Sequence, residues 1–574
     1  MVASLIGKNA LQILEERYLL RDAKGKLIET AEELFSRVAG CIAKAENHDR
    51  ERWEALFLGV LSRLEFLPNS PTLMNAGLPK GQLSACFVLP VNDSLNAIFT
   101  SLKKAALIHQ SGGGTGFNFS KLRSSGTPVS LGKGTSSGPV AFMKIFDAAT
   151  EYVKQGGKRR GANMGILNID HPDIEAFISA KRDRKSLNNF NLSIGVSESF
   201  MNAVENNLSW SLKDPSSGTV TKKVSAKKLW NSIAETAWET GDPGLVFFDS
   251  INRFNPTPSL GNIECTNPCG EVPLLDYESC NLGSVNLSKM VIRDGNNFKI
   301  DYDKLAQTVA LGIRFLDNAI SVNHYLFAPI KSMAFKNRKI GLGLMGWADL
   351  LMLLDIPYAS DKAVELAEKL MSFVKAESYK ASTALASERG CFLSWEESNF
   401  YPQSKMRNAT CNSIAPTGTI SVIANTSYSI EPLYALAYNR VGILENTSQQ
   451  EVSQIFEMKM KQKGYWNAQL KSKVLKSGTI KDVPYIPEEV KKVFETSLEI
   501  PYKYHLLHQK AFQKFTDNAV SKTINLPANA TPNNVSDIYF SAWKYGLKGI
   551  TIYRDGSNKK QVLQKCNTGA SLIC

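Results

Sequence analysis

A short segment near the middle of the sequence concentrates side chains that can do chemistry. The 17 residues of Glu264–Cys280 hold three cysteines and three glutamates. Within this segment Asn267, Cys269 and Glu271 alternate with Pro268 and Gly270. Alternate side chains of an extended segment point to the same side, so we expect an amide, a thiol and a carboxylate on one face. A carboxylate beside a thiol can act as a base on a substrate hydroxyl while the sulfur does other chemistry.

The spacing of these cysteines bears on whether they could bind a metal. Cys265 and Cys269 are four residues apart, Cys280 follows eleven later, and no histidine lies within 40 residues on either side. That pattern does not favour a zinc site. Three cysteines in a hydrophobic core remain an alternative. The chain has nine cysteines, an odd number, which argues against a structural disulfide framework and leaves buried thiols or redox chemistry.

Four further segments contain candidate binding residues. Cys86 stands where an apolar strand is expected to start, so by itself it is typical of a core residue. The glycine run 111–116 offers bare backbone N–H groups that could hold a phosphate, and a tight turn beside an active site explains it equally well. Ala415–Ser421 places hydroxyls and a glycine at an expected helix start, which predicts an anion site or a plain helix cap. The loop 156–163 carries three consecutive basic residues between glycines and suits nucleotide phosphates or bases, with a solvated surface loop as the alternative.

The composition is that of an ordinary globular protein. The 574 residues are 43% hydrophobic and 21% charged, which excludes a disordered or collagen-like chain. No run of about 18 apolar residues occurs and the N-terminus is charged too early for a signal peptide, so we expect a cytoplasmic protein without a membrane span. The net charge of +13 favours anionic partners. Because the longest basic block is only three residues, nucleic acid is not the expected partner.

The pattern of apolar residues predicts a helical start followed by mixed α/β structure. Residues 9–18 and 30–46 have helical spacing, and Thr30 with Glu33 forms a capping-box pattern. From residue 66 to about 286, short apolar runs alternate with glycine-rich turns and helical stretches. Residues 447–520 are expected to form a polar helical insertion, after which α/β texture resumes. The residues from 556 onward read as a polar tail that contains Cys566 and Cys574.

Taken together, these segments resemble the catalytic subunit of ribonucleotide reductase, most closely the dimeric type of its adenosylcobalamin-dependent class II. The segments that carry the resemblance are SPTLMNAG, SGGGTGFNFSKLR, NPCGE, GLGLMGWAD, APTGTIS, VSKTINLP and GITIYRDGS. The resemblance runs from about residue 5 to 560. It implies a ten-stranded α/β barrel with a central finger loop, preceded by a small helical domain. The implied domains are 1–66, the barrel at 67–555 and a flexible redox tail at 556–574.

The resemblance assigns chemical roles to the cysteine segment. Cys269 corresponds to the cysteine whose thiyl radical removes hydrogen from the ribose 3′ carbon. Glu271 corresponds to the base on the 3′ hydroxyl, and Asn267 to its hydrogen-bonding partner. Cys86 and Cys280 correspond to the pair that supplies two electrons while the 2′ hydroxyl leaves as water. Cys566 and Cys574 correspond to tail thiols that re-reduce this pair from thioredoxin or a similar reductant.

The resemblance also implies binding residues for the substrate and for an effector. The ribonucleotide, expected to be a diphosphate, would contact Ser70, Thr72, Ser84, Ala85, Asn267, Pro416, Thr417, Gly418, Thr419, Ile420 and Ser421. A deoxynucleotide triphosphate effector would lie at a homodimer interface on Asp93, Arg123 and Lys133. The segment that relays its identity to the substrate base would comprise Lys158, Arg159, Arg160 and Asn163.

The radical source separates the classes of this family. Class I subunits have a Tyr-Tyr pair that receives the radical from a partner subunit, whereas this sequence has only Tyr553 at the corresponding place. The resemblance therefore implies adenosylcobalamin as the cofactor, with no metal ligand supplied by the protein, because no Asp-x-His-x-x-Gly motif is present. A class I large subunit that needs a radical-generating partner is the alternative.

Overall fold

The computed structural model describes residues 6–129, 134–155, 159–295, 297–441 and 448–557, and its centre is one large sheet. Ten strands make up this sheet. They are β1 (Phe66–Pro68), β2 (Cys86–Val88), β3 (Gly114–Asn118), β6 (Asn163–Asn168), β7 (Phe190–Val196), β10 (Gly244–Phe247), β13 (Ser279–Asn286), β16 (Ile340–Met345), β19 (Thr523–Leu526) and β20 (Gly549–Arg554). The strands β2, β3, β6, β7 and β10 are parallel neighbours in that order, as expected for strands joined through helices.

The two ends of the sheet come together and close it. On one side β13 pairs with β16, and Leu342 of β16 pairs in turn with Asn412. Ile414, two residues later, pairs with Val520, which leads directly into β19 at the other end. These bridges complete a ring of strands and confirm the predicted ten-stranded α/β barrel.

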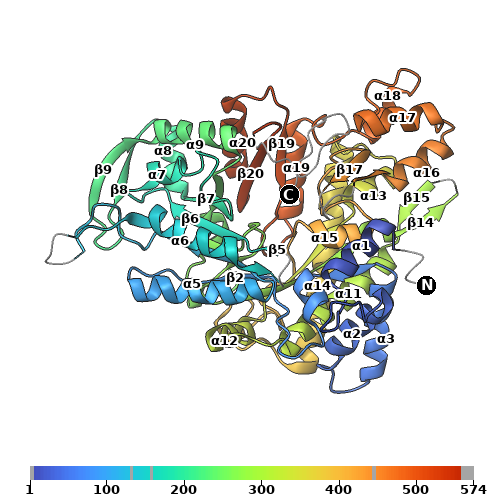
Figure 1. The fold of residues 1–574 in the computed structure, drawn as a ribbon, viewed down its shortest axis with the longest axis horizontal. Coiled ribbons are helices and arrows are strands. Elements are labelled where there is room, and N and C mark those ends of the chain that lie inside the picture. Colours follow the sequence, from blue (N-terminus) through green and yellow to red (C-terminus); the bar gives the residue numbers. More distant parts are fainter. Residues whose placement is uncertain (1–5, 130–133, 156–158, 296, 442–447, 558–574) are drawn as a thin grey trace.

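The N-terminal helices form the predicted all-helical start of the chain. They are α1 (Lys8–Arg17), α2 (Ala31–Ala43) and α3 (Arg50–Ser62). Thr30 and Glu33 make the reciprocal capping-box hydrogen bonds that the sequence predicts at the start of α2. The apolar face of α2, which includes the fully buried Leu34, Phe35 and Val38, packs into a core shared with α11 (Tyr302–Val322) and α14 (Asp361–Arg389). Figure 1 shows the three helices beside α11 and α14.

The remaining elements surround the barrel or extend from it. The other helices are α4 (Ser70–Asn75), α5 (Leu95–Gln110), α6 (Gly138–Tyr152), α7 (Ile174–Ile178), α8 (Glu198–Glu205), α9 (Ala226–Thr240), α10 (Phe248–Arg253), α12 (Ala328–Asn337), α13 (Trp347–Leu353), α15 (Gly418–Ile423) and α20 (Pro532–Lys544). Five two-stranded hairpins complete the strands: β4 (Lys154–Gln155) with β5 (Arg159–Arg160), β8 (Ser209–Lys213) with β9 (Val220–Ser225), β11 (Cys265–Thr266) with β12 (Pro273–Leu274), β14 (Val291–Asp294) with β15 (Asn297–Ile300), and β17 (Ala437–Val441) with β18 (Ser448–Val452). Among the described residues, no helix has the length and apolar character to cross a membrane.

The helices between β18 and β19 divide into two groups. The first comprises α16 (Gln454–Gln462), α17 (Ala468–Ser477) and α18 (Glu488–Val493), which share a small core of their own around Phe456, Val474 and Phe494. The second is α19 (Tyr502–Gln513), which packs against α14 and β19 and buries His505 and His508. The last part of the stretch 447–520 therefore belongs to the barrel wall.

Candidate active site

The segment with three cysteines forms a narrow hairpin inside the barrel. Its strands β11 and β12 pair with each other and not with the main sheet. We call this hairpin, Cys265–Leu274, the finger loop. Two glycines of β3 make room for it. A Cβ atom on Gly116 would lie 1.8 Å from the carbonyl oxygen of Thr266, and one on Gly114 would lie 2.8 Å from Pro268 Cγ. The glycine run therefore permits close approach of two backbones at these positions, which agrees with a turn beside the active site.

The tip of this finger loop is a tight turn, so the expected extended segment with all three side chains on one face is wrong. The Gly270 N–H donates to the carbonyl oxygen of Asn267 at 3.1 Å, and the Val272 N–H donates to Asn267 Oδ1 at 2.9 Å. These bonds reverse the chain within four residues. As a result the Cys269 side chain is exposed, whereas Asn267 and Glu271 are buried.

The two remaining cysteines of the predicted set are side by side on two paired strands of the barrel wall. Cys86 of β2 stands directly opposite Cys280 of β13 in an antiparallel pair. Such partners have Cα atoms about 4.5–5.5 Å apart, inside the range of about 4.4–6.8 Å that a disulfide requires. Asn267 Nδ2 donates a hydrogen bond to Cys86 Sγ at 3.1 Å, so the finger loop touches this pair. The structure therefore brings Asn267, Cys86 and Cys280 together as the sequence resemblance implies.

Glu271 is a buried carboxyl that titrates close to neutrality. Burial raises its pKa to about 7, and a hydrogen bond from Asn267 opposes part of that rise. Its Oε2 atom has no hydrogen-bond partner among the described residues. Its backbone carbonyl, by contrast, accepts bonds from Ser413 Oγ at 2.8 Å and from the Ala519 N–H at 2.9 Å. A carboxyl with this pKa and a firmly held backbone can accept and return a proton near pH 7.

The same burial keeps the paired thiols protonated. Burial, and then the charge of Glu271, raises the pKa of Cys86 well above its ordinary value. Burial also raises the pKa of Cys280, while the charge of Lys339 opposes the rise. Two protonated thiols side by side can supply two electrons and two protons as they form a disulfide.

A cavity of 970 Å³ opens in front of the finger loop. Its lining includes the exposed Cys269, the turn before α15 and Tyr553 of β20. Pro416 of that turn faces the cavity, as do Gly418 and Thr419 at the start of α15. Thr417 Oγ1 bonds to Ser421 Oγ at 2.7 Å and accepts a hydrogen bond from the Ser429 N–H at 2.8 Å. The hydroxyls of Thr417 and Ser421 thus stabilise the turn. These two residues and Ile420 are buried, on the side of the turn away from the cavity.

The other predicted substrate residues brace the strand that carries Cys86. Ser70 Oγ bonds to the Tyr18 hydroxyl at 2.7 Å, which ties this segment to the N-terminal helices. Thr72 Oγ1 donates to the Leu83 carbonyl at 3.0 Å. Ser84 Oγ accepts from Asn323 Nδ2 at 3.2 Å, and the Ala85 N–H donates to the Cys280 carbonyl at 3.1 Å. Their role in substrate binding remains a prediction.

The predicted effector and relay residues are only partly described. Asp93 and Arg123 form an ion pair at 2.7 Å, and both are partly exposed. Arg159 and Arg160 form β5, while Lys133, Lys158, Cys566 and Cys574 lie outside the described residues. Asn163 is buried at the start of β6, where its side chain bonds to the hydroxyls of Thr115 and Thr150 at 2.8 and 2.9 Å. No group of three or more potential metal ligands occurs in the described part of the chain.

Two buried lysines in the cavity wall were not predicted from the sequence. Lys522 pairs with Glu431 at 2.5 Å. Lys548 donates to the carbonyls of Asp517 and Asn518, each at 2.6 Å, and burial lowers its pKa to about 7. Lys522 lies in the motif VSKTINLP and Lys548 directly precedes GITIYRDGS, but a lysine in or beside a strand motif has no spacing signal that separates a cavity residue from a surface one.

Comparison with known proteins agrees with this geometry. The profile of the ribonucleotide reductase barrel domain matches residues 84–405 and 401–553, and that of the ribonucleotide reductase all-alpha domain matches residues 4–81. The chain belongs to the ribonucleotide reductase family. Two relatives, from Thermoplasma acidophilum and Mycobacterium tuberculosis, are named vitamin B12-dependent ribonucleoside-diphosphate reductase. Each is 46% identical to this reductase chain, over 97% and 96% of it, and the matches cover 80% of either relative.

A solved structure shares the fold. The alpha subunit of the Actinobacillus ureae class Id ribonucleotide reductase superposes with a TM-score of 0.79 over 96% of this chain and 98% of its own. Its sequence is 23% identical, so the likeness supports the reductase barrel and nothing finer.

Proposed function

We propose that the chain reduces ribonucleoside diphosphates to 2′-deoxyribonucleotides with adenosylcobalamin as the radical source. The observation that carries the proposal is the finger loop, which exposes Cys269 to a large cavity and places Asn267 against Cys86. The names of the two relatives at 46% identity support the cofactor and the diphosphate substrate. The reaction is the one that the family resemblance of the sequence implies.

The chain's own residues divide the chemistry between them. A thiyl radical on Cys269 removes the hydrogen atom from the ribose 3′ carbon, and Glu271 takes the proton of the 3′ hydroxyl. The 2′ hydroxyl leaves as water with a proton from one thiol of the pair, and the hydrogen of the other thiol goes to the 2′ carbon. Cys86 and Cys280 thereby supply two electrons and become a disulfide. Cys269 returns its hydrogen to the 3′ carbon, and Glu271 returns its proton to the 3′ oxygen. The sum is ribonucleotide plus two thiols to deoxyribonucleotide, water and disulfide. Because Cys269 lines the cavity, bound substrate and cofactor would cover the radical and separate it from bulk solvent.

The apolar wall of the cavity beside Cys269 suits part of the proposed cofactor. Its 970 Å³ lies at the upper end of volumes typical of ligand pockets, and much of its wall is apolar. The apolar residues of the cavity wall that would hold part of the group are Met164, Leu245, Val246 and Val422. When bound, adenosylcobalamin supplies a carbon radical by breaking its cobalt–carbon bond. Cys269 is the exposed thiol of the finger loop that such a radical would meet.

We further infer a homodimer that binds a deoxynucleotide effector. Exposed apolar side chains gather on α5 and α6, namely Leu95, Phe99, Leu107, Ile145 and Tyr152. Such a surface is typical of a subunit interface. The Asp93–Arg123 pair stands immediately before α5, where an effector could contact both subunits. A cytoplasmic location, reduction by thioredoxin through Cys566 and Cys574, and the domain limits 1–66, 67–555 and 556–574 are part of the same proposal.

The decisive experiment is a single turnover without any other protein. Purified, prereduced chain is mixed with CDP, with and without adenosylcobalamin, and dCDP is measured. We expect at least about one dCDP per active site only when the cofactor is present, and none from C269S. Product formed only after addition of a second, radical-generating protein would favour the class I alternative. No product from any ribonucleotide in the presence of cofactor and effectors would refute the proposal.

A further inference from the structure

Three reactive or charged side chains stand in a row: Cys86 and Cys280 on two neighbouring strands, and Lys339 immediately before a third. Cys86 of β2 is opposite Cys280 of β13. On the other side of β13, Asn281 is the register partner of Ile340 in β16. One step back along both parallel strands, Cys280 is next to Lys339, so the lysine borders the thiol pair.

Lys339 is a buried cation that the proposed reaction does not use. It is 2% exposed, and its Nζ pairs with Glu278 Oε2 at 2.7 Å. Glu278 also accepts hydrogen bonds from Asn337 Nδ2 at 2.5 Å and from the Leu275 N–H at 2.7 Å. Three donors therefore surround this carboxylate, and one of them is the Lys339 ammonium group in the barrel wall.

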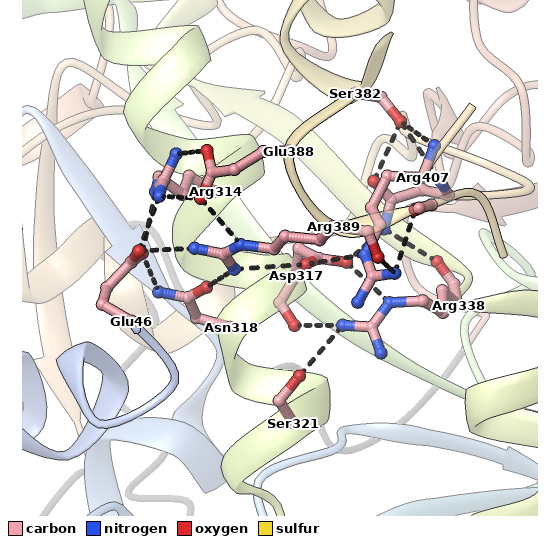
Figure 2. Close-up of polar contacts among 12 residues, drawn as sticks. Glu46, Arg314, Asp317, Asn318, Ser321, Arg338, Ser382, Glu388, Arg389 and Arg407 are labelled. Carbon is pink, nitrogen blue, oxygen red and sulfur yellow. Dashed lines mark hydrogen bonds and ion pairs between the residues drawn. The ribbon is translucent and has the colours of Figure 1, made fainter. Parts of the chain in front are cut away.

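Arg338, the residue before Lys339, holds the backbone in place at this point of the chain. Arg338 has a positive φ of 45° and ends α12. Its guanidinium donates to Asp317 Oδ1 and to the Asp317 carbonyl, both at 2.8 Å, and its own carbonyl accepts from Asn408 Nδ2 at 3.0 Å. Figure 2 shows Arg338 within a wider network in which Asp317 also meets Arg389 and Arg407. This anchoring leaves Lys339 little freedom to move away from Cys280.

The two sulfurs consequently have different electrostatic neighbours. Cys86 lies near the carboxyl of Glu271 and receives the Asn267 amide. Cys280 also lies near the carboxyls of Glu271 and Glu278. The cation of Lys339 acts on it more strongly than either carboxyl does, and among the described residues no lysine acts on Cys86 in this way. In thiol–disulfide exchange, the sulfur that departs more readily is the one whose thiolate is more stable.

We propose that Lys339 stabilises Cys280 as the departing thiolate when the Cys86–Cys280 disulfide is re-reduced, so that an incoming dithiol attacks Cys86. The inference rests on the proposed function for the origin of this disulfide. A thiolate of the dithiol bonds to Cys86 Sγ, the Cys86–Cys280 bond breaks, and its electron pair goes to Cys280 Sγ. The second thiol of the dithiol then displaces Cys86. The two protons of the dithiol end on the two cysteines, and the dithiol becomes a disulfide.

The test measures reduction of the oxidised full-length chain directly. Protein oxidised at Cys86 and Cys280 is mixed with dithiothreitol, quenched with an alkylating reagent at set times, and the two cysteines are quantified by peptide mass spectrometry. An opposite charge within about 4–6 Å shifts a pKa by about 1–3 units, and thiol exchange rates follow about half of such a shift. We therefore expect K339M to slow reduction about tenfold.

A set of variants separates charge from folding. K339M leaves Glu278 unpaired beside Cys280 and is expected to be slowest. The double variant K339M/E278Q removes both charges and is expected to be intermediate, whereas E278Q and K339R are expected to be at least about as fast as the wild type. Lys459→Met removes another buried, ion-paired lysine, in α16, and is the matched control. Thermal unfolding midpoints report on folding in each case.

The order of the rates decides the outcome. Reduction at the wild-type rate in both K339M and K339M/E278Q refutes the proposal, and so does a slow E278Q, because a packing defect and not the lysine charge would then set the rate. If K339M does not fold, the double variant and E278Q still give the comparison. Failure of the proposed function is distinguishable, since it appears as wild-type protein that makes no dCDP with adenosylcobalamin, whatever the reduction rates.

Discussion

Replacement of Glu271 with Gln is expected to stabilise the protein at alkaline pH while it abolishes nucleotide reduction. The carboxyl is 3% exposed, its Oε2 atom has no hydrogen-bond partner among the described residues, and burial raises its pKa from 4.5 to about 7. In the unfolded chain it ionises near pH 4.5. Between these values the folded state binds more protons than the unfolded state, so stability falls as the pH rises from about 4.5 to 7 and is constant above. Glutamine does not titrate and escapes this cost.

The size of the effect follows from the pKa difference. Each unit is worth about 1.4 kcal/mol, so burial of the carboxyl costs about 3 kcal/mol at pH 8. At pH 5, where the folded carboxyl is protonated and only the unfolded one is ionised, it costs about 1 kcal/mol. The barrel segment matched at residues 84–553 has an unfolding entropy of about 1 kcal/mol/K, taking about 2.1 cal/mol/K per residue. E271Q is therefore expected to raise the unfolding midpoint by about 3 °C at pH 8 and by about 1 °C at pH 5.

The assay is thermal unfolding of wild type and E271Q at the two pH values, together with the single-turnover yield of dCDP. Glu46→Gln is an informative contrast, because burial of Glu46 is outweighed by hydrogen bonds from Arg314, Asn318 and Arg389, which hold its pKa below the ordinary value. E46Q is expected to lower the midpoint at pH 8. If E271Q and wild type differed in unfolding midpoint by the same amount at pH 5 and pH 8, the raised pKa of Glu271 would be refuted. Retained dCDP formation by E271Q would refute the role of Glu271 as the base.

Three further predictions concern other parts of the site. G116A is expected to destabilise the barrel by about 3 kcal/mol or more and to abolish product, since the new Cβ would meet the finger-loop backbone at 1.8 Å; G134A, which has open space around it, is the control, and equal midpoints for the two would count against the close packing. Y553F is expected to keep cofactor-dependent single-turnover activity, because the proposed radical source acts without a tyrosine relay; its loss would point to the class I alternative. The double variant C566S/C574S is expected to turn over with dithiothreitol but not with thioredoxin, and equal losses with both reductants would exclude the tail as a shuttle.

The local elements of this fold could be predicted from sequence because their signals are local. The capping box at Thr30 and Glu33 and the helical spacing of residues 9–18 and 30–46 each depend on residues within one or two turns of each other. The closure of the barrel through Asn412 and Ile414 has no local pattern in the sequence, because those residues form isolated bridges and not a strand. Only the family resemblance predicted it.

The thiol pair illustrates a second limit. Cys86 and Cys280 are far apart in the sequence, and neither lies in a spacing pattern that demands a partner. They meet because β2 and β13 pair antiparallel in one particular register. A shift of that register by one residue would turn one of the two side chains to the other face of the sheet. Pairing of this kind is a property of the whole barrel, so sequence reasoning reaches it only through the family.

The finger loop shows how the geometry of a segment can be missed by the pattern of its residue types. That Asn267, Cys269 and Glu271 act together as an amide, a thiol and a base is a prediction from those types. Their alternation suggested an extended strand, but Gly270 takes a positive φ of 81° and the turn closes on Asn267. What holds this turn in place is backbone contact with Gly116 and hydrogen bonds to the carbonyl of Glu271. Such contacts depend on the absence of a side chain and on main-chain atoms, so the residue types of the segment itself do not encode them.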